Sequence, residues 1–214
     1  MLKVWGRKSS SNVQAVMWCI AELELPVERI DAGFKYGVVD TPAYLAMNPN
    51  GTVPTLQDGD RITLWESGAI LRYLANNYAD GPFWPSDIAA RARIDMWAEW
   101  AKLNVALKFG APIFWQIVRT PPERRDALAI ARAVTEFERM LKIADAQLQK
   151  SAWLASDDFT LADIQFGHLL YRYFNIEIDR SPPERIVDYY GKLKQRSCFQ
   201  DHVMVSYEEL RDPK

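Results

Sequence analysis

The chain has 214 residues, of which 49% are hydrophobic, and its formal net charge is −2. A chain of this length and composition can bury a substantial core in one large domain or two small ones. The slightly acidic balance argues against a nucleic-acid partner, because binding to phosphates requires a basic surface.

The sequence also argues against export and against membrane insertion. The N-terminal residues contain no long apolar stretch, so we expect no secretory signal. No window approaches the roughly 18 consecutive apolar residues of a membrane-spanning helix. The two cysteines, Cys19 and Cys198, are far apart and form no Cys-x-x-Cys pair. We therefore expect a cytoplasmic protein with no membrane partner, no disulfide framework, no zinc site and no dithiol redox chemistry.

The beginning of the chain predicts a strand, a helix and a second strand. Residues 2–5 predict the first strand, and residues 13–23 carry apolar side chains at helical spacing before Pro26 ends the run. Residues 9–12, with the sequence Ser-Ser-Ser-Asn, offer caps for this helix. Residues 27–30 predict the second strand, and the two strands of such a β-α-β unit should be parallel.

The next elements are a predicted hairpin and a helix. Asn-Pro-Asn-Gly at residues 48–51 has strong turn chemistry. Apolar runs at 53–56 and 62–64 flank an Asp-Gly-Asp turn, which is typical of a hairpin. Glu66 and Ser67 then precede an apolar helix.

A glycine and two prolines within residues 79–86 predict a linker. We assign residues 1–78 to an α/β domain and residues 87–214 to an all-helical domain, because no convincing strand follows the linker. The fold class is therefore an α/β N-terminal domain followed by an all-α C-terminal domain.

Four helices are expected in the C-terminal domain. The first covers 87–109 and is interrupted or kinked by Gly110 and Pro112. The second begins near Pro121-Pro122 and carries a clean apolar stripe from Ile130 to Leu148. The third begins with a capping box at Thr160 and Asp163, and the last extends from Pro182-Pro183 to about Arg196.

This order of elements and four local motifs resemble the cytosolic glutathione transferases, most closely their serine-using, theta-like bacterial branch. The motifs are the serine cluster at 9–12, Val53-Pro54, Glu66-Ser67 and the capping box at 160–163. The resemblance covers nearly the whole chain. It implies a thioredoxin-like N-terminal domain that binds glutathione and a helical domain that supplies most of the pocket for the electrophile. For the capping box it implies a role in folding only.

The resemblance places glutathione on two of these motifs. It implies a cis Pro54, so that the backbone of Val53 can pair with the cysteinyl residue of glutathione as an added strand would. We place Thr52 in the same binding loop. The helix start at Glu66 and Ser67 is expected to hold the γ-glutamyl end, because free N–H groups and the helix dipole favour a carboxylate there. Simple capping of that helix is the alternative and uses the same geometry.

The resemblance aligns Ser10 with the catalytic serine of the family. A hydroxyl that donates to the glutathione sulfur stabilises the thiolate, whereas a free thiol titrates near pKa ~8.5. The family commonly has Cys-Arg where this chain has Val13 and Gln14, which leaves room for a slip of one residue. Ser11 is therefore the second candidate, and Asn12 is a candidate extra donor to the sulfur. The alternative for the cluster is helix capping, which we expect to be the only role of two of its three serines.

Residues for the second substrate are less well defined by the sequence. The resemblance draws them from the long helix, where four aromatic residues are candidates that core packing would explain equally well: Trp97, Trp100, Phe109 and Trp115. His168 and His202 are isolated, and a core or surface histidine is commoner than a ligand or base.

These observations predict a glutathione transferase that conjugates the glutathione thiolate to small hydrophobic electrophiles in detoxification, without a metal or redox cofactor. Dehalogenation, ether cleavage and peroxide reduction would use the same thiolate. A symmetric homodimer is implied by the resemblance alone. One alternative is a non-enzymatic module that uses this fold for protein–protein contact. Another is a cysteine-dependent thiol transferase, which the absence of cysteine at 9–12 disfavours.

Overall fold

The N-terminal part of the protein is built on a mixed sheet. The computed structural model describes residues 1–211. Its four strands are arranged in the order β2-β1-β3-β4, and they are β1 (Leu2–Trp5), β2 (Val27–Ile30), β3 (Thr55–Asp58) and β4 (Ile62–Trp65). β1 pairs parallel with β2 and antiparallel with β3, and β3 pairs antiparallel with β4. The predicted β-α-β unit and hairpin are therefore confirmed.

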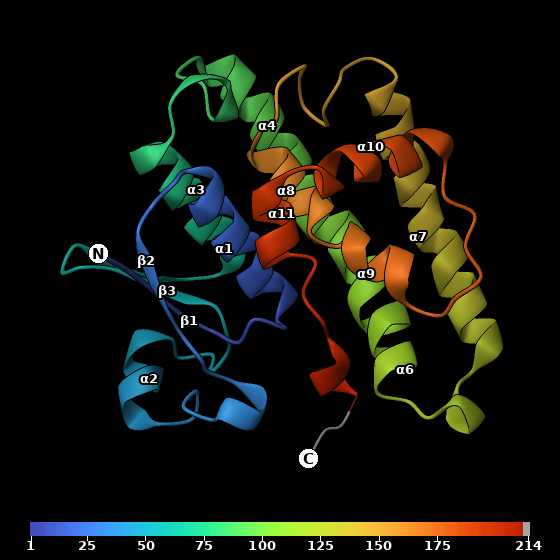
Figure 1. The fold of residues 1–214 in the computed structure, drawn as a ribbon, viewed down its shortest axis with the longest axis horizontal. Coiled ribbons are helices and arrows are strands. Elements are labelled where there is room, and N and C mark those ends of the chain that lie inside the picture. The colour runs from blue at the N-terminus through green and yellow to red at the C-terminus, as the bar shows by residue number, and fades with distance from the viewer. Residues whose placement is uncertain (212–214) are drawn as a thin grey trace.

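Two long helices cover one side of this sheet. They are α1 (Ser11–Glu22) and α3 (Ser67–Tyr78), which pack against each other, and a short helix α2 (Pro42–Met47) lies on the other side (Figure 1). Helix α2 was not expected, because its segment has no clear apolar periodicity. Its start is marked by Thr41, whose hydroxyl accepts the N–H of Tyr44 at 3.3 Å, and by proline at the first helical position.

Residues 88–211 form helices joined by loops, and the structure has no strand within this range. Its helices are α4 (Ile88–Trp100), α5 (Leu107–Phe109), α6 (Trp115–Val118), α7 (Ala127–Leu148), α8 (Leu161–Gly167), α9 (Leu170–Asn175), α10 (Glu184–Lys194) and α11 (Ser197–His202). Figure 1 shows them beside the sheet domain, with α7 along the outer edge and α11 next to α1. The expected fold class is confirmed. Within residues 1–211 no helix has the length and apolar character needed to cross a bilayer.

The long first helix of this part continues further than expected. Two π-helical stretches, 101–106 and 110–114, join α4, α5 and α6 into one helical course that reaches Val118. The predicted effect of Gly110 and Pro112 takes the form of a change in helix type. The α-helical pattern stops at Phe109, but the chain does not leave the helical course, because wider turns replace the hydrogen bonds that proline would break. Such wide turns are rare and are often found at functional sites.

Two further boundaries differ from the expectation. α7 begins at Ala127, where the Asp126 carboxylate accepts the N–H of Ala129 at 2.9 Å, and only a 3-10 turn follows Pro121. A separate short helix, α11, follows α10, and it was not expected because its six residues are too few for a periodic pattern.

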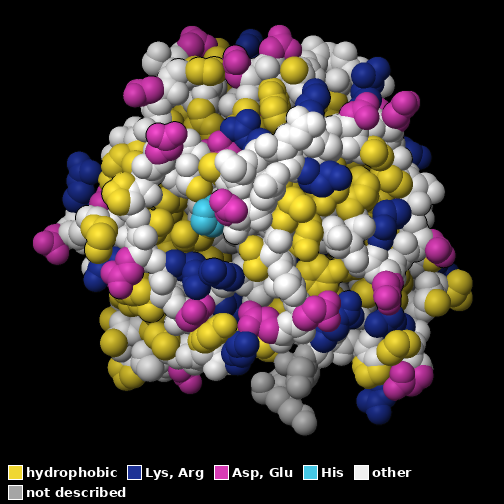
Figure 2. Space-filling view, viewed as in Figure 1, with side chains coloured by type: hydrophobic (Ala, Val, Ile, Leu, Met, Phe, Trp, Pro, Cys, Tyr) yellow, Lys and Arg dark blue, Asp and Glu magenta, His cyan; other side chains and the backbone are white. Residues whose placement is uncertain are grey.

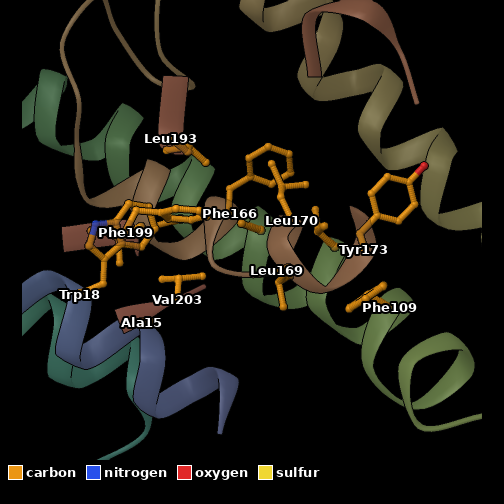
Figure 3. Close-up of a cluster of buried hydrophobic side chains, with 14 of the residues drawn as sticks. Ala15, Trp18, Phe109, Phe166, Leu169, Leu170, Tyr173, Leu193, Phe199 and Val203 are labelled. Atoms are coloured by element: carbon orange, nitrogen blue, oxygen red, sulfur yellow. The ribbon is translucent and has the colours of Figure 1, made fainter. Parts of the chain in front are cut away.

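One continuous apolar core joins the two parts of the molecule. Figure 3 shows Trp18 of α1 against Phe199 of α11, with Phe166 of α8 close by. The rings of Trp18 and Phe199 meet edge to face with centroids 4.9 Å apart. Gly167 allows this approach, since a Cβ there would lie 2.7 Å from a methyl carbon of Leu193 and 3.2 Å from the Trp18 ring.

The predicted capping box is present at the start of α8. The buried carboxylate of Asp163 accepts the N–H of Thr160 at 2.8 Å and the N–H of Leu154 at 2.9 Å. It also accepts the Tyr189 hydroxyl at 2.8 Å. The box therefore ties α8 to α10 and to the loop before it, as a folding element would.

The charged side chains on the surface are mixed in sign. Figure 2 shows basic and acidic groups interspersed on the face that it draws, without a continuous basic stripe. This distribution on that face agrees with the net charge of −2.

Candidate active site

A cavity of about 390 Å³ lies between the start of α1, the loop before β3 and the helical part. The lining residues are Arg7, Ser9, Ser10, Ser11, Asn12, Gly33, Phe34, Val39, Gly51, Thr52, Val53, Trp115 and Arg172. It thus brings together five of the eight predicted site residues, and Pro54 follows Val53 directly. A larger hollow of about 600 Å³, between α7 and residues 177–181, contains no predicted site residue.

The serine cluster does not cap α1. Ser10 occupies the N-cap position, but its hydroxyl makes no capping hydrogen bond, and it is 8% exposed at the cavity. The Ser9 hydroxyl donates instead to the carboxylate of Glu209, near the end of the described chain. The expectation that two serines serve as caps is therefore wrong, because a distant carboxylate binds Ser9. The Ser10 hydroxyl is available to a ligand in the cavity.

The loop before β3 presents an unpaired edge of backbone. The Val53–Pro54 peptide bond is cis, as expected. The carbonyl of the preceding Thr52 accepts the Tyr44 hydroxyl at 2.6 Å and the Asn48 side-chain N–H at 2.8 Å, which holds the loop in place. Among residues 1–211, the N–H and C=O of Val53 have no hydrogen-bond partner. A peptide-like ligand in the cavity can therefore pair with them.

Lys102, a residue of the helical part that no sequence motif marked, reaches the start of α3. The Lys102 ammonium donates to the Ser67 hydroxyl at 2.9 Å and to Oδ1 of Asn12 at 3.0 Å. The Ser67 hydroxyl in turn lies 3.3 Å from the same Asn12 oxygen. Glu66 is the N-cap residue of α3 and its side chain makes no capping hydrogen bond, so the first N–H groups of α3 are open. Burial lowers the pKa of Lys102, and the charges of Glu66 and Glu99 oppose that shift.

This contact fixes the direction of the Asn12 amide. An ammonium only donates, so the atom of Asn12 that it contacts is the oxygen. The NH₂ group of Asn12 must then point away from Lys102. Asn12 lines both this cavity and the next one, so its two N–H donors are available at their common boundary.

A second cavity of about 200 Å³ adjoins the first. The two share Ser11, Asn12, Trp115 and Arg172, and the remaining walls are Lys102, Ala106, Leu107, Phe109, Gly110, Phe114, His168 and Leu169. Of the four aromatic residues expected at the second substrate, Phe109 and Trp115 line this cavity, and their role stays a prediction. Trp97 and Trp100 pack edge to face with centroids 5.1 Å apart and line neither cavity.

Two buried nitrogen-containing side chains reach this second cavity, Arg172 from α9 and His168 from the residue that follows α8. Arg172 is 4% exposed; it donates to the carbonyl of Ser9 and lies 4.4 Å from the centre of the Phe114 ring. Burial and the neighbouring Arg7 lower its pKa to about 9. His168 is also buried, and burial and the charge of Lys102 lower its pKa to about 3, so it is neutral near pH 7. Nothing in the local sequence marks Arg172, because only the packing of α9 brings it to the serine cluster.

The described residues contain no group of three or more His, Cys, Asp or Glu side chains that could hold a metal ion. Cys19 is buried within α1, and burial raises the pKa of its thiol. A buried thiol of this kind is not a nucleophile. The polar side-chain groups that line the two cavities are hydroxyl, amide, ammonium and guanidinium groups and the imidazole of His168.

Two protein-family models match this chain. The glutathione S-transferase N-terminal domain matches residues 1–76, and the glutathione S-transferase C-terminal domain matches residues 108–194. The chain belongs to the glutathione S-transferase family. The expected family and its transferase activity are thus confirmed, whereas the proposed domain boundary at residues 79–86 stays a prediction.

Relatives of this transferase match along three quarters or more of its length. The glutathione S-transferase GstB of Escherichia coli strain K12 is 37% identical over 96% of this chain and 99% of its own. Glutathione S-transferase 3 of Zea mays is 32% identical over 76% of this chain and 73% of its own. The theta class enzyme of Xanthomonas axonopodis pv. citri, solved with glutathione bound, superposes with a TM-score of 0.90 at 40% identity. That match covers 96% of this chain and 98% of the other.

Proposed function

We propose that this transferase binds glutathione in the larger cavity and that Ser10 stabilises its thiolate. The observation that carries the proposal is the Ser10 hydroxyl, which makes no capping bond and lies in a cavity with the unpaired backbone of Val53. A donor at the sulfur favours the charged form, so the bound thiol becomes more acidic than the free one.

The remaining predicted residues divide among the parts of glutathione. The backbone of Val53, held by cis Pro54 and the loop at Thr52, pairs with the cysteinyl residue. The N-terminus of α3 with Ser67 takes the γ-glutamyl carboxylate, and Glu66 takes its amino group. The amide of Asn12 adds N–H donors beside the sulfur.

The reaction we propose is conjugation. The thiolate attacks an electrophilic carbon of a small hydrophobic substrate, a carbon–sulfur bond forms, and the bond to the leaving group breaks. Phe109 and Trp115 line the smaller cavity, which gives that substrate an apolar wall beside the sulfur. We propose no metal and no redox cofactor, because the substrate itself supplies the nucleophile.

Ser10→Ala tests the assignment, and Ser11→Ala is its matched control. We expect Ser10→Ala to retain glutathione on an affinity matrix but to raise the pKa of the bound thiol by about 1–2 units, the scale of a hydrogen bond to a charged group. The thiolate absorbance of the binary complex, titrated with pH, measures this shift. An unchanged titration in Ser10→Ala with a raised pKa in Ser11→Ala would transfer the role to Ser11. Glutathione binding without turnover of a model aryl halide would instead support an interaction module.

We further propose a cytoplasmic homodimer. Met96, Leu103 and Leu107 are 56%, 53% and 66% exposed, and their spacing of seven and four residues places them on one face of the long helical course. A helix face with this many exposed apolar side chains is typical of a protein interface. Cys19 and Cys198 are both free thiols, which fits a reducing compartment.

A further inference from the structure

The two adjoining cavities carry an excess of positive charge. Their walls include the side chains of Arg7, Lys102 and Arg172, and neither set of lining residues contains an aspartate or a glutamate. The nearest carboxylates act from outside: Glu209 on Arg7, and Glu66 and Glu99 on Lys102. For Arg172, no carboxylate among residues 1–211 lies within ion-pair distance.

Arg172 is the most unusual of these groups. A guanidinium has five N–H donors, and within the described chain this one uses a single acceptor, the carbonyl of Ser9. Its Nε is buried without a partner, and the side chain is 4% exposed. A buried charge without a counter-ion is strongly unfavourable, and a neutral amide could hold the Ser9 carbonyl as well. An anionic ligand would supply the missing partner.

Lys102 provides a second cation at the same cavity. Its two acceptors, Ser67 and Asn12, are neutral, and an ammonium has three donors, so one N–H is still available. The rest of the wall is apolar and aromatic, including Leu107, Phe109 and Phe114. The smaller cavity therefore offers two cations at the edge of an apolar surface.

Glutathione itself leaves the Arg172 side of this cavity open in the proposed arrangement, whereas Lys102 also reaches the γ-glutamyl site through Ser67 at 2.9 Å. The glutathione backbone pairs with Val53 on the larger cavity, and its γ-glutamyl carboxylate lies at the start of α3. The smaller cavity is bounded by the helical part beyond Asn12 and contains neither Val53 nor Ser67. Whatever enters it next to the sulfur belongs to the second substrate.

We propose that the smaller cavity selects electrophiles that carry a carboxylate on an apolar, aromatic-sized body, with the carboxylate bound by Arg172 and Lys102. This inference rests on the proposed function and adds to it the chemical class of the electrophile. A guanidinium binds a carboxylate through two parallel N–H donors, which gives orientation as well as affinity.

A matched pair of aryl chlorides isolates this effect. 4-Chloro-3-nitrobenzoate and 4-chloro-3-nitrobenzamide differ only in the group opposite the chlorine, an anion in one and a neutral amide in the other. In both, the thiolate attacks the carbon that bears chlorine, the carbon–sulfur bond forms and chloride leaves. Because the same bound thiolate attacks both, the ratio of their kcat/KM values cancels any change in thiol acidity. Each value is divided by the uncatalysed rate constant with free glutathione.

We expect the unaltered protein to favour the benzoate by about tenfold or more, the scale of one charge-assisted hydrogen bond. Arg172→Gln and Lys102→Gln should each bring the ratio close to one. The two variants are independent, so loss of folding in one leaves the other as the test. Arg119→Gln is the control, since Arg119 stacks on Trp115 at 3.9 Å and lines neither cavity. It should keep the ratio of the unaltered protein.

The outcomes separate this inference from the proposed function. Conjugation of both arenes at equal normalised rates would overturn the carboxylate preference and leave the transferase proposal standing. A preference for the benzoate that survives both Arg172→Gln and Lys102→Gln would also overturn the inference, because another group would then bind the carboxylate. Conjugation of neither arene would overturn the proposed function and this inference with it.

Discussion

Replacing Lys102 by methionine should make the bound glutathione thiol less acidic, although Lys102 lies in the helical part of the chain. Methionine keeps the length and apolar stem of the side chain and removes its charge. Two effects act together. The Asn12 amide loses the donor that fixes its oxygen at 3.0 Å, and the site of the thiolate loses a nearby positive charge. Both effects weaken stabilisation of the anion.

The size of the charge effect follows from the geometry. The ammonium is 3.0 Å from the Asn12 oxygen, and the width of the amide and one further hydrogen bond place the sulfur about 7 Å from it. Two unit charges ~7 Å apart interact by about 2.4 kcal/mol at an effective dielectric constant of ~20, or roughly 1.7 pKa units. Access of water to the cavities reduces this value, so we expect a rise of about 1 unit.

The assay is the pH titration of thiolate absorbance in the binary complex, together with the pH dependence of kcat. If the site lowers the thiol pKa by about 2 units from ~8.5, the bound thiol titrates near ~6.5. A rise of about 1 unit would then reduce the thiolate fraction at pH 7 about threefold and leave it nearly unchanged at pH 9. The loss in kcat should therefore disappear at high pH. Lys108→Met is the matched control, since Lys108 pairs with Glu136 at 3.9 Å on the surface and lines neither cavity.

Two results would refute this reasoning. A thiol pKa in Lys102→Met equal to that of the unaltered protein would show that neither the charge nor the orientation of Asn12 reaches the sulfur. A loss of kcat that persists at pH 9 would show that Lys102 acts on a step after ionisation. Lys102→Arg should restore most of the acidity, because it restores the charge and the donor.

Three other predictions concern stability and assembly. Asp163→Ala should lower the free energy of unfolding by about 3–5 kcal/mol in urea denaturation, because it leaves buried donors unpaired. An unchanged urea midpoint would contradict a structural role for the capping box. Buried His168 has a pKa of about 3 against an ordinary 6.5, so only the unfolded chain takes up its proton as the pH falls. The free energy of unfolding should therefore fall by about 2 kcal/mol more between pH 7 and pH 5 than it does in His168→Gln, and parallel curves for the two proteins would rule this out. Leu103→Lys should shift the protein toward monomer in light scattering. Leu128→Lys, at a position 72% exposed on α7, is the control and should not. Equal masses for the two variants would argue against the proposed interface.

Local sequence patterns predicted the elements whose causes are local. The β-α-β unit, the hairpin and the capping box depend on neighbouring residues, and each was visible as periodicity or turn chemistry. The cis bond before Pro54 followed from the family resemblance. The π-helical course through Gly110 and Pro112 could not be predicted. A proline in a sequence normally indicates a helix break, and no local pattern shows when wider turns will accommodate it.

The candidate site residues also divide into those that a local motif marks and those that only tertiary packing brings to the site. Ser10, Val53 and Ser67 stand at element boundaries, where a motif can mark them. Lys102 lies 90 positions from Asn12, and Arg172 lies 163 positions from Ser9. No local pattern connects such pairs, since only the packing of the helical part against α1 and α3 brings them together.

The contacts that hold the serine segment, residues 9–12, bear on the order in which the protein assembles during synthesis. Ser9 is held through its carbonyl by Arg172 and through its hydroxyl by Glu209, two residues that follow all four strands of the sheet in the chain. The sheet can form as soon as residues 2–65 have emerged from the ribosome, but the segment that carries Ser10 gains its two anchors only when residues 172 and 209 have been synthesised. Synthesis therefore orders the assembly, with the sheet first and the fixed position of the serine segment well after it.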